Sequence, residues 1–257
     1  MSLFDEVSPA TVAWFRVIGA SIILSLVSVR HLRRRFDRRE LGAIAVFGIA
    51  SALMNTFFYL AIDRLPLGKS VTIEFIGPIA VAAARTRSRR NGTALVAAIV
   101  GVAILSGVEI GGEPLGLLFL FAASVMWAAY IVLGSRVARR AGGVEGLGLG
   151  LAIGAVVIAP IGAPGSGPVW SSPRLLALCV LVGFLSNAIG YGIDQAVLRR
   201  IPVRRFSILL ALLPVVAVIA GFIALDQHPS TIDFVGMAFV VAGVVIQERE
   251  TLESTVD

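Results

Sequence analysis

Long apolar runs, separated by short clusters of charge, limit what this sequence can fold into more than any other feature. Runs of about 20 apolar residues, the length that one helical crossing of a bilayer requires, recur from one end of the chain to the other. Apolar residues and glycine together make up about two thirds of the chain, against about 45–50% in soluble domains. Because a soluble core has no need for so many uninterrupted runs, we expect an all-α polytopic membrane protein.

We expect nine membrane-spanning helices, one for each apolar run. Their ranges are 10–29, 41–62, 67–84, 93–108, 115–133, 147–163, 175–198, 203–225 and 232–247. Of the 22 Lys and Arg residues, 17 lie in four alternate stretches, 30–39, 85–90, 136–140 and 199–205, and the loops between them hold only three. The positive-inside rule then places these Arg-rich loops and the C-terminus in the cytoplasm, with the protein in the inner membrane.

Other classes of partner and activity find little support in the sequence. The net charge of +6 could suggest nucleic acid, but the arginines lie in short blocks between apolar spans, where they orient helices in a bilayer. The single cysteine, Cys179, and two histidines, His31 and His228, predict neither a disulfide nor a metal site. No Ser/His/Asp set and no phosphate-binding lysine motif is present. We therefore expect no cofactor, no metal and no enzyme activity, with the lipid bilayer as the main partner.

A short motif and several single residues recur at an almost constant offset, which indicates an internal duplication. Arg64-Leu65-Pro66 recurs as Arg200-Ile201-Pro202 and Pro78 as Pro214, both at an offset of 136, whereas Gly19-Ala20 recurs as Gly154-Ala155 and Gly101 as Gly236 at 135. One residue has therefore been gained or lost near the second helix of each copy.

The two copies should cross the membrane in opposite directions, because matched spans are five apart in order and five is odd. Inverted repeats are typical of secondary transporters, in which the substrate site lies between the copies. A duplicated structural bundle without a pore is the alternative. We expect residues 1–113 to form a first repeat of four helices and residues 114–257 a second repeat of five. The unequal count predicts a further helix of about 20 apolar residues upstream of Met1.

Three segments of the chain resemble a known family of transporters. After Pro66-Leu67-Gly68, the segment Thr72-Ile73-Glu74-Phe75-Ile76-Gly77-Pro78 resembles EamA-type members of the drug/metabolite transporter superfamily, closest to the threonine/homoserine exporter branch. The segment 127–134 is similar to the sixth helix of that branch, and Tyr191-Gly192-Ile193-Asp194 is similar to its Tyr-x-x-Glu, with Asp for Glu. The resemblance implies ten helices in two inverted halves and export of amino acids or related metabolites.

Glu74 is the strongest candidate for a functional group, because an ionised side chain at the centre of a span is costly and is retained mainly for function. Pro78 has no N–H to donate, so it leaves the carbonyl of Glu74 without its helical partner. Pro214 is the matching helix-breaking residue of the second copy. We expect Glu74 to bind a proton or an ammonium group; a structural ion pair with Arg16 or Lys69 is the alternative.

Further polar residues lie inside the expected spans. Arg16 could bind a substrate carboxylate through two parallel hydrogen bonds, or could extend to the interface or pair with Glu74. A polar stripe on the second span and its repeat mates could line a lumen, or could join helices by hydrogen bonds. The stripe consists of Ser51, Asn55 and Tyr59, and the mates of these residues are Asn187, Tyr191 and Gln195, with Asp194 beside them. Trp127 could stack on a substrate, although packing is the commoner role of such an aromatic residue.

These features together predict a secondary transporter that exports a small polar metabolite, such as an amino acid, by alternating access. Protons are a possible coupling ion, and the oligomeric state is left open. A lipid-modifying membrane enzyme would need clustered Asp, His or Lys at one membrane face, and a passive channel would give gradient-independent, non-saturable flux.

Overall fold

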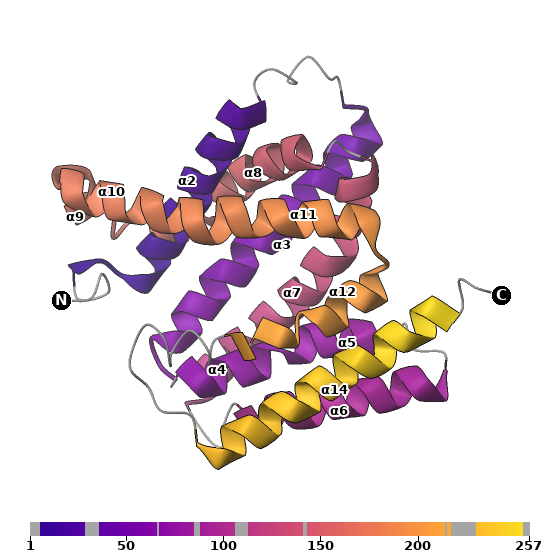
Figure 1. Ribbon diagram of the computed structural model, residues 1–257. Helices are drawn as coiled ribbons and strands as arrows, with labels where there is room; N and C mark the ends of the chain where they lie inside the picture. Colours follow the sequence, from indigo (N-terminus) through magenta and orange to yellow (C-terminus); the bar gives the residue numbers. More distant parts are fainter. Residues whose placement is uncertain are drawn as a thin grey trace. The chain divides into compact units, whose positions relative to one another are not determined.

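The computed structural model describes residues 6–28, 36–65, 67–84, 88–105, 113–140, 143–213, 215–216 and 230–253, and the regular elements among them are all helices (Figure 1). The chain divides into two compact units. The first unit combines Met1–Arg64 with Glu113–Ile201, and the second combines Leu65–Gly112 with Pro202–Asp257. Each unit therefore takes helices from both expected repeats, and the compact units divide the chain differently from the sequence duplication.

The first unit is a bundle of long helices. Its helices are α2 (Pro9–Ser28), α3 (Arg38–Ile62), α7 (Pro114–Arg140), α8 (Val144–Gly162), α9 (Gly167–Ser171), α10 (Pro173–Val182), the π-helix η2 (Gly183–Ile189) and α11 (Gly190–Arg200). Local chemistry sets several of the starts. Asp37 caps α3 by accepting the N–H of Glu40 at 2.7 Å, and the Glu40 carboxylate accepts the N–H of Asp37 at 3.1 Å. Proline stands in the first turn of both α7 and α10, where its missing N–H is not needed.

The second unit holds shorter helices. They are α4 (Leu67–Glu74), α5 (Ile76–Ala84), α6 (Arg89–Leu105), α12 (Val203–Leu209) and α14 (Thr231–Glu253). The repeat mates α6 and α14 pack on each other, and so do α5 and α12.

The predicted membrane fold is confirmed. Each of the nine expected spans overlaps a helix among the described residues, although the eighth is described only as far as Val216. Five helical stretches in the described residues are long and apolar enough to cross a membrane: Pro9–Val27, Arg38–Ile62, Pro114–Arg140, Val144–Gly162 and Pro173–Arg200. The chain is thus an all-α, multi-pass membrane protein.

Two spans depart from a regular α-helix. The third is interrupted at Phe75, which lies between α4 and α5 directly after Glu74 and three residues before Pro78. The seventh runs unbroken from α10 to α11 (Figure 1), and the seven residues of η2 between them are π-helical. A π-segment inside an α-helix is commonly found at a functional site.

Repeat mates in the structure run antiparallel to each other, as inverted copies should. Thr11, near the start of α2, donates to the carbonyl of Gly162 at the end of α8, at 2.8 Å, whereas Leu24 lies against Gly148 at the other end of α8. In the second unit, Gly101 of α6 contacts its own mate Gly236 of α14, and Ala94 contacts Gly243.

Close backbone contact between helices depends on glycine. A methyl group on Gly48 of α3 would overlap the carbonyl of Gly150 in α8, and one on Gly154 would lie 2.5 Å from the carbonyl of Gly48. A methyl group on Gly183 would lie 2.6 Å from the carbonyl of Arg16. Small residues of this kind let membrane helices approach closely enough for favourable van der Waals packing. Gly150 and Gly154 of α8 thus let α3 lie against the backbone of α8.

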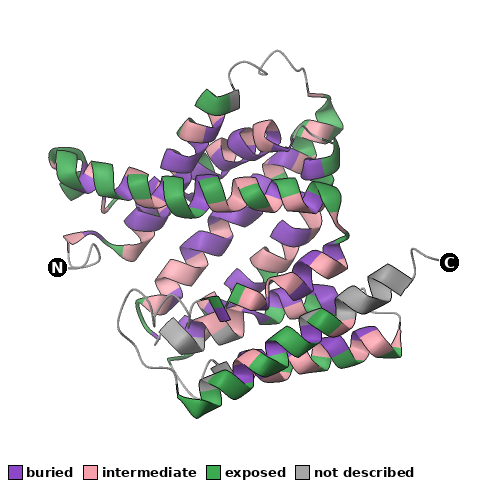
Figure 2. Cartoon of the chain, viewed as in Figure 1, coloured by how far each residue is buried: buried purple, intermediate pink, exposed green. Residues whose placement is uncertain are grey.

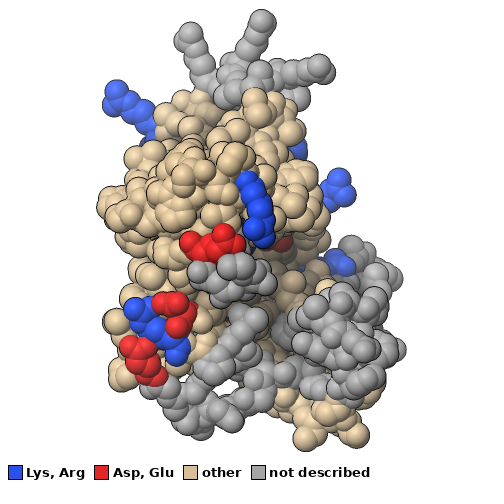
Figure 3. Space-filling view, turned by 90° about the vertical axis from the view of Figure 1, so that its left-hand side faces the viewer, with Lys and Arg blue, Asp and Glu red and all other residues tan. Residues whose placement is uncertain are grey.

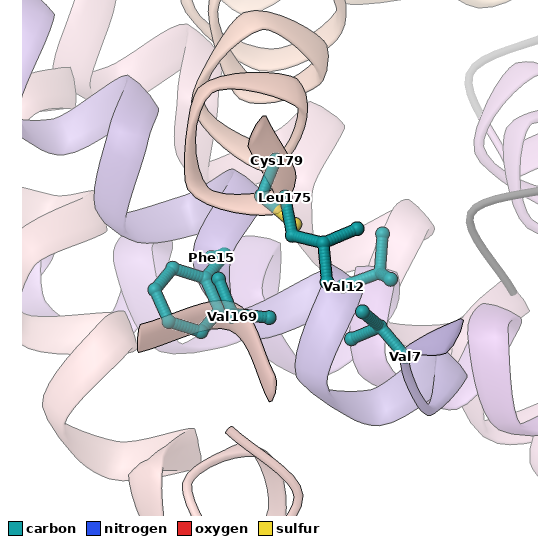
Figure 4. Close-up of a cluster of buried hydrophobic side chains, with 6 residues drawn as sticks. All are labelled: Val7, Val12, Phe15, Val169, Leu175 and Cys179. Carbon is teal, nitrogen blue, oxygen red and sulfur yellow. The ribbon is translucent and has the colours of Figure 1, made fainter. Parts of the chain in front are cut away.

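Apolar side chains fill the interior and also cover much of the outside. Figure 4 shows an interior cluster of the first unit, in which Phe15 and Val12 of α2 face Val169, Leu175 and Cys179. The α10–α11 stretch presents an exposed side in Figure 2 that includes Leu185 at 55% and Ile193 at 58% exposure. The described part of the face in Figure 3 is mostly uncharged, with charged side chains in a few small groups. Exposed apolar surface of this extent suits contact with lipid.

We expect Gly48→Ala to disrupt the packing of α3 on α8, because the added methyl group meets backbone that cannot move aside as a flexible side chain would. The destabilisation should be about 1–3 kcal/mol or more, as for other overpacked cores. The fraction of folded, detergent-soluble protein and its Tm measure the effect. Gly42→Ala on the same helix is the control, since a methyl group there meets nothing within 4 Å. Equal Tm values for the two variants would contradict the prediction.

Candidate functional site

The guanidinium of Arg16 lies among polar groups of two other helices. Its Nε and one terminal nitrogen donate to Ser186 Oγ at 3.1 and 2.8 Å, and the same terminal nitrogen donates to Asn187 Oδ1 at 2.9 Å. The other terminal nitrogen donates to the hydroxyl of Tyr59. The guanidinium carbon also lies 4.7 Å from the centroid of the Tyr59 ring, within cation–π range. Arg16 of α2 thereby joins α3 to η2.

All of these partners are neutral, so the charge of Arg16 has no counter-ion in the cluster. Within the described part of the chain, no carboxylate lies within 4.0 Å of its guanidinium. The buried amide of Asn187 adds a second donor, because its Nδ2 has no hydrogen-bond partner among the described residues. A cation and an unused N–H side by side are suited to binding a carboxylate.

Local structure explains how Ser186 and Asn187 reach Arg16. Gly183 at the start of η2 allows the backbone of this span to lie against the backbone of α2 at Arg16. The Ser186 hydroxyl lies 2.5 Å from the carbonyl of Val182 and 2.9 Å from Asn187 Oδ1, which holds it in place to accept from Arg16. The π-helical turn thus presents two consecutive polar side chains to the same guanidinium.

A second group of polar side chains joins α3, α7 and α11. Asn55 Nδ2 donates to the Tyr191 hydroxyl at 2.6 Å, and the ring of Tyr191 lies 5.1 Å from that of Tyr130. The Tyr130 hydroxyl in turn donates to Asp194 Oδ2 at 2.9 Å. Phe47 stacks on the other side of Tyr130, with ring centroids 5.3 Å apart. The Asp194 carboxylate is therefore held by a buried hydroxyl within an aromatic wall.

Asn55 and Tyr191 are repeat mates, 136 positions apart, and they hydrogen-bond to each other. Two equivalent residues of inverted copies can touch only where the axis that relates the copies passes between them. The polar stripe therefore meets its own counterpart at the symmetry axis of the first unit. Asn55 also donates to the carbonyl of Ser51 at 2.8 Å, so its amide is fixed from both sides.

The structure also describes the remaining four predicted substrate-site residues. Ser51 is fully buried, and its hydroxyl donates to the Phe47 carbonyl of its own helix at 3.0 Å. Trp127 is half-buried on α7, and Gln195 is buried on α11. Glu74, half-buried, is the last residue of α4 in the second unit.

Two of the residues that build the site were missed by the sequence analysis, and two other predictions fall beyond the structure. Ser186 and Tyr130 were not among the predicted site residues, although each is a polar side chain inside an apolar span, which is the signal that identified their neighbours. Pro214 and the side chain of Lys69 lie outside the described residues. Among the described residues, no group of three His, Cys, Asp or Glu side chains is close enough to hold a metal ion.

The fold and its polar groups within the spans define a multi-pass helical membrane protein. Residues 114–247 match the EamA-like transporter family, and the chain belongs to this family. The resemblance seen in the sequence is thereby confirmed.

Relatives extend this match over nearly the whole chain. The threonine/homoserine exporters RhtA of Salmonella typhimurium (strain LT2) and of Escherichia coli (strain K12) are each 30% identical over 248 residues, which are 94% of this chain and 82% of theirs. A solved crystal structure superposes with a TM-score of 0.76 at 19% identity, covering 96% of this chain and 89% of the other, and shows the shared fold alone. The chain is thus a transporter related to small-metabolite exporters.

Proposed function

We propose that the protein is a secondary transporter that exports an amino acid or a close relative of one by alternating access. The observation that supports this most directly is the guanidinium of Arg16, which is half-buried in the first unit and is held by neutral partners. A cation within a membrane span is costly unless something supplies the missing charge, and the carboxylate of an amino acid would do so. The activity of the relatives, export of threonine and homoserine, agrees in substrate class and direction.

In this proposal the substrate carboxylate accepts hydrogen bonds from Arg16 and from the free Nδ2 of Asn187. Tyr59 and Ser186 orient the guanidinium, so that its planar donors are aligned before the substrate arrives. Preorganised donors increase affinity because little side-chain freedom is lost on binding.

The second polar group would form a wall of the same pathway. Asn55 and Tyr191 meet where the two copies are equivalent, and a site shared by inverted copies is expected there. Asp194 is then available for the substrate ammonium, with Ser51 and Gln195 as nearby members of the stripe and Trp127 as a stacking surface. Glu74 would exchange a proton, since it is a midspan carboxylate directly before the interruption at Phe75.

We propose that the Arg-rich loops and the C-terminus face the cytoplasm, on the basis of the arginine distribution. A fluorescent reporter fused after Glu248 should therefore fluoresce, whereas alkaline phosphatase at the same point should stay inactive. Active phosphatase there would place the C-terminus in the periplasm and contradict the proposed orientation. The direction of export would then have to be assigned for the opposite orientation.

Arg16→Gln should raise the KM for threonine about 10-fold or more in proteoliposome counterflow, because it removes a charge-assisted hydrogen bond worth about 1.5–3 kcal/mol. Arg16→Lys keeps the charge without the planar fork and should give an intermediate KM. The exposed Arg174→Gln is the control, and its KM should equal that of the wild type.

Transport of threoninol, which lacks the carboxylate, tests whether Arg16 recognises the substrate carboxylate or only contributes to helix packing. The wild type should prefer threonine over threoninol, and Arg16→Gln should lose most of that preference. A variant that transports both compounds more slowly but keeps the preference would assign Arg16 a structural role. Flux that does not saturate and ignores the gradient would instead indicate a channel.

Glu74→Gln should bind substrate but lose pH-dependent net flux, because the amide keeps the shape of the carboxylic acid and cannot exchange a proton. Transport is measured at several external pH values, with counterflow as the coupling-independent reference. Wild-type net flux with an unchanged pH profile would remove the coupling role. Failure to accumulate in the membrane would favour a structural ion pair.

A further inference from the structure

A hollow of about 380 Å³ opens in the first unit where α11 ends and α8 begins. It is lined by Gly143, Val144, Gln195, Ala196, Arg199 and Arg200. Among these residues, only Gln195 belongs to the polar stripe, and neither Arg16 nor Asp194 contributes to the lining. The hollow therefore shares Gln195 with the proposed pathway, but it includes neither of the charged side chains proposed to bind the substrate.

Gln195 is the unusual member of this lining. Its side chain is only 1% exposed, and neither Nε2 nor Oε1 has a hydrogen-bond partner among the described residues. It rests on Gly134 of α7, where a methyl group would lie 3.2 Å from Nε2, so the amide has little room to turn elsewhere. A buried amide with both ends unused is unfavourable, which indicates that a ligand completes its hydrogen bonds.

The charge around the hollow selects for an anion. Arg199 lies one helical turn beyond Gln195, and with Arg200 it brings two exposed guanidinium groups to the rim. The N-terminus of the 19-residue helix α8 lies beside them, and its N-cap, Gly143 with φ of 62°, offers no side chain to its N–H groups. Helix N-termini attract anions through these N–H groups and the helix dipole. Glu145 in the first turn of α8 is not part of the lining.

We propose that this hollow is a binding site for a phosphate group, carried either by an anionic phospholipid headgroup or by free phosphate. The two guanidinium groups and Gln195 Nε2 donate to the phosphate oxygens. Gln195 Oε1 accepts from a hydroxyl, which a protonated phosphate or a glycerol headgroup supplies. Because Arg199 and Arg200 end a long apolar span, the site lies at the level where lipid headgroups are found.

The test follows thermal unfolding of the full-length protein in detergent, a readout that does not depend on transport. One arm titrates potassium phosphate against potassium chloride of equal ionic strength. The other adds phosphatidylglycerol against phosphatidylcholine in mixed micelles. Stabilisation by phosphatidylglycerol alone identifies a lipid site, and stabilisation by phosphate identifies a site for the free ion. No rise in Tm in either arm overturns the proposal.

Two variants locate the effect. Arg199→Gln/Arg200→Gln should weaken binding about 10-fold or more, whereas Arg38→Gln/Arg89→Gln, which removes two exposed arginines from other Arg-rich loops, should leave it unchanged. Equal losses in the two double variants would mean a general charge effect and would overturn the site.

Gln195→Leu separates a ligand role from a structural one. Without ligand it should be at least as stable as the wild type, because an unsatisfied amide is removed, and with ligand its Tm should rise less. A lower Tm without ligand would show that the amide serves the fold and would overturn the proposal. Free amino acids could instead raise the Tm in a way that depends on Gln195, while phosphate and phosphatidylglycerol do not. That result would also overturn the proposal.

Discussion

Backbone contact between helices, made possible by glycine, is the interaction on which the rest of the first unit depends. Within a bilayer, lipid tails are as apolar as leucine, so helices gain little from burying apolar side chains and must gain from close packing. Gly48 against Gly150 sets the spacing of α3 and α8, and Gly183 brings η2 against α2. Only at this spacing can Arg16 reach partners on two helices at once. The glycines therefore position the polar site without contributing a polar atom to it.

The neutral surroundings of Arg16 show that hydrogen bonding and charge neutralisation are separate effects in such a bundle. Hydroxyl and amide groups can satisfy the N–H donors of a guanidinium without cancelling its charge. A carboxylate of the protein would have satisfied the N–H donors and also neutralised the charge. It would then have left no unpaired charge for a substrate carboxylate to neutralise. Asp194, which faces Tyr130, shows the same arrangement with the opposite sign. Among the described residues, Arg16 and Asp194 are thus each held by neutral groups.

Long apolar runs in the sequence were sufficient to predict the fold class and helices at the expected spans, because bilayer thickness acts on composition directly. The polar stripe stays a prediction as a lining for the substrate, although Asn55 does hydrogen-bond to its mate Tyr191. The partners of each residue could not be predicted, since they depend on how far helices rotate about their own axes. That rotation is why Ser51 bonds to its own helix and why Ser186 and Tyr130 were overlooked. The division into two units, each with helices from both repeats, is likewise a property of packing.

The π-helical segment explains the change of offset between the repeats. Gly48 and Gly183 occupy equivalent close contacts 135 positions apart, whereas Asn55 and Tyr191 correspond at 136. The additional residue of the second copy therefore lies between Gly183 and Tyr191, which is where the helix widens into η2. A π-turn holds about one residue more than an α-turn, so η2 takes up the additional residue within its wider turns. The helix beyond η2 therefore keeps the rotational phase of its repeat mate, and Tyr191 still faces Asn55.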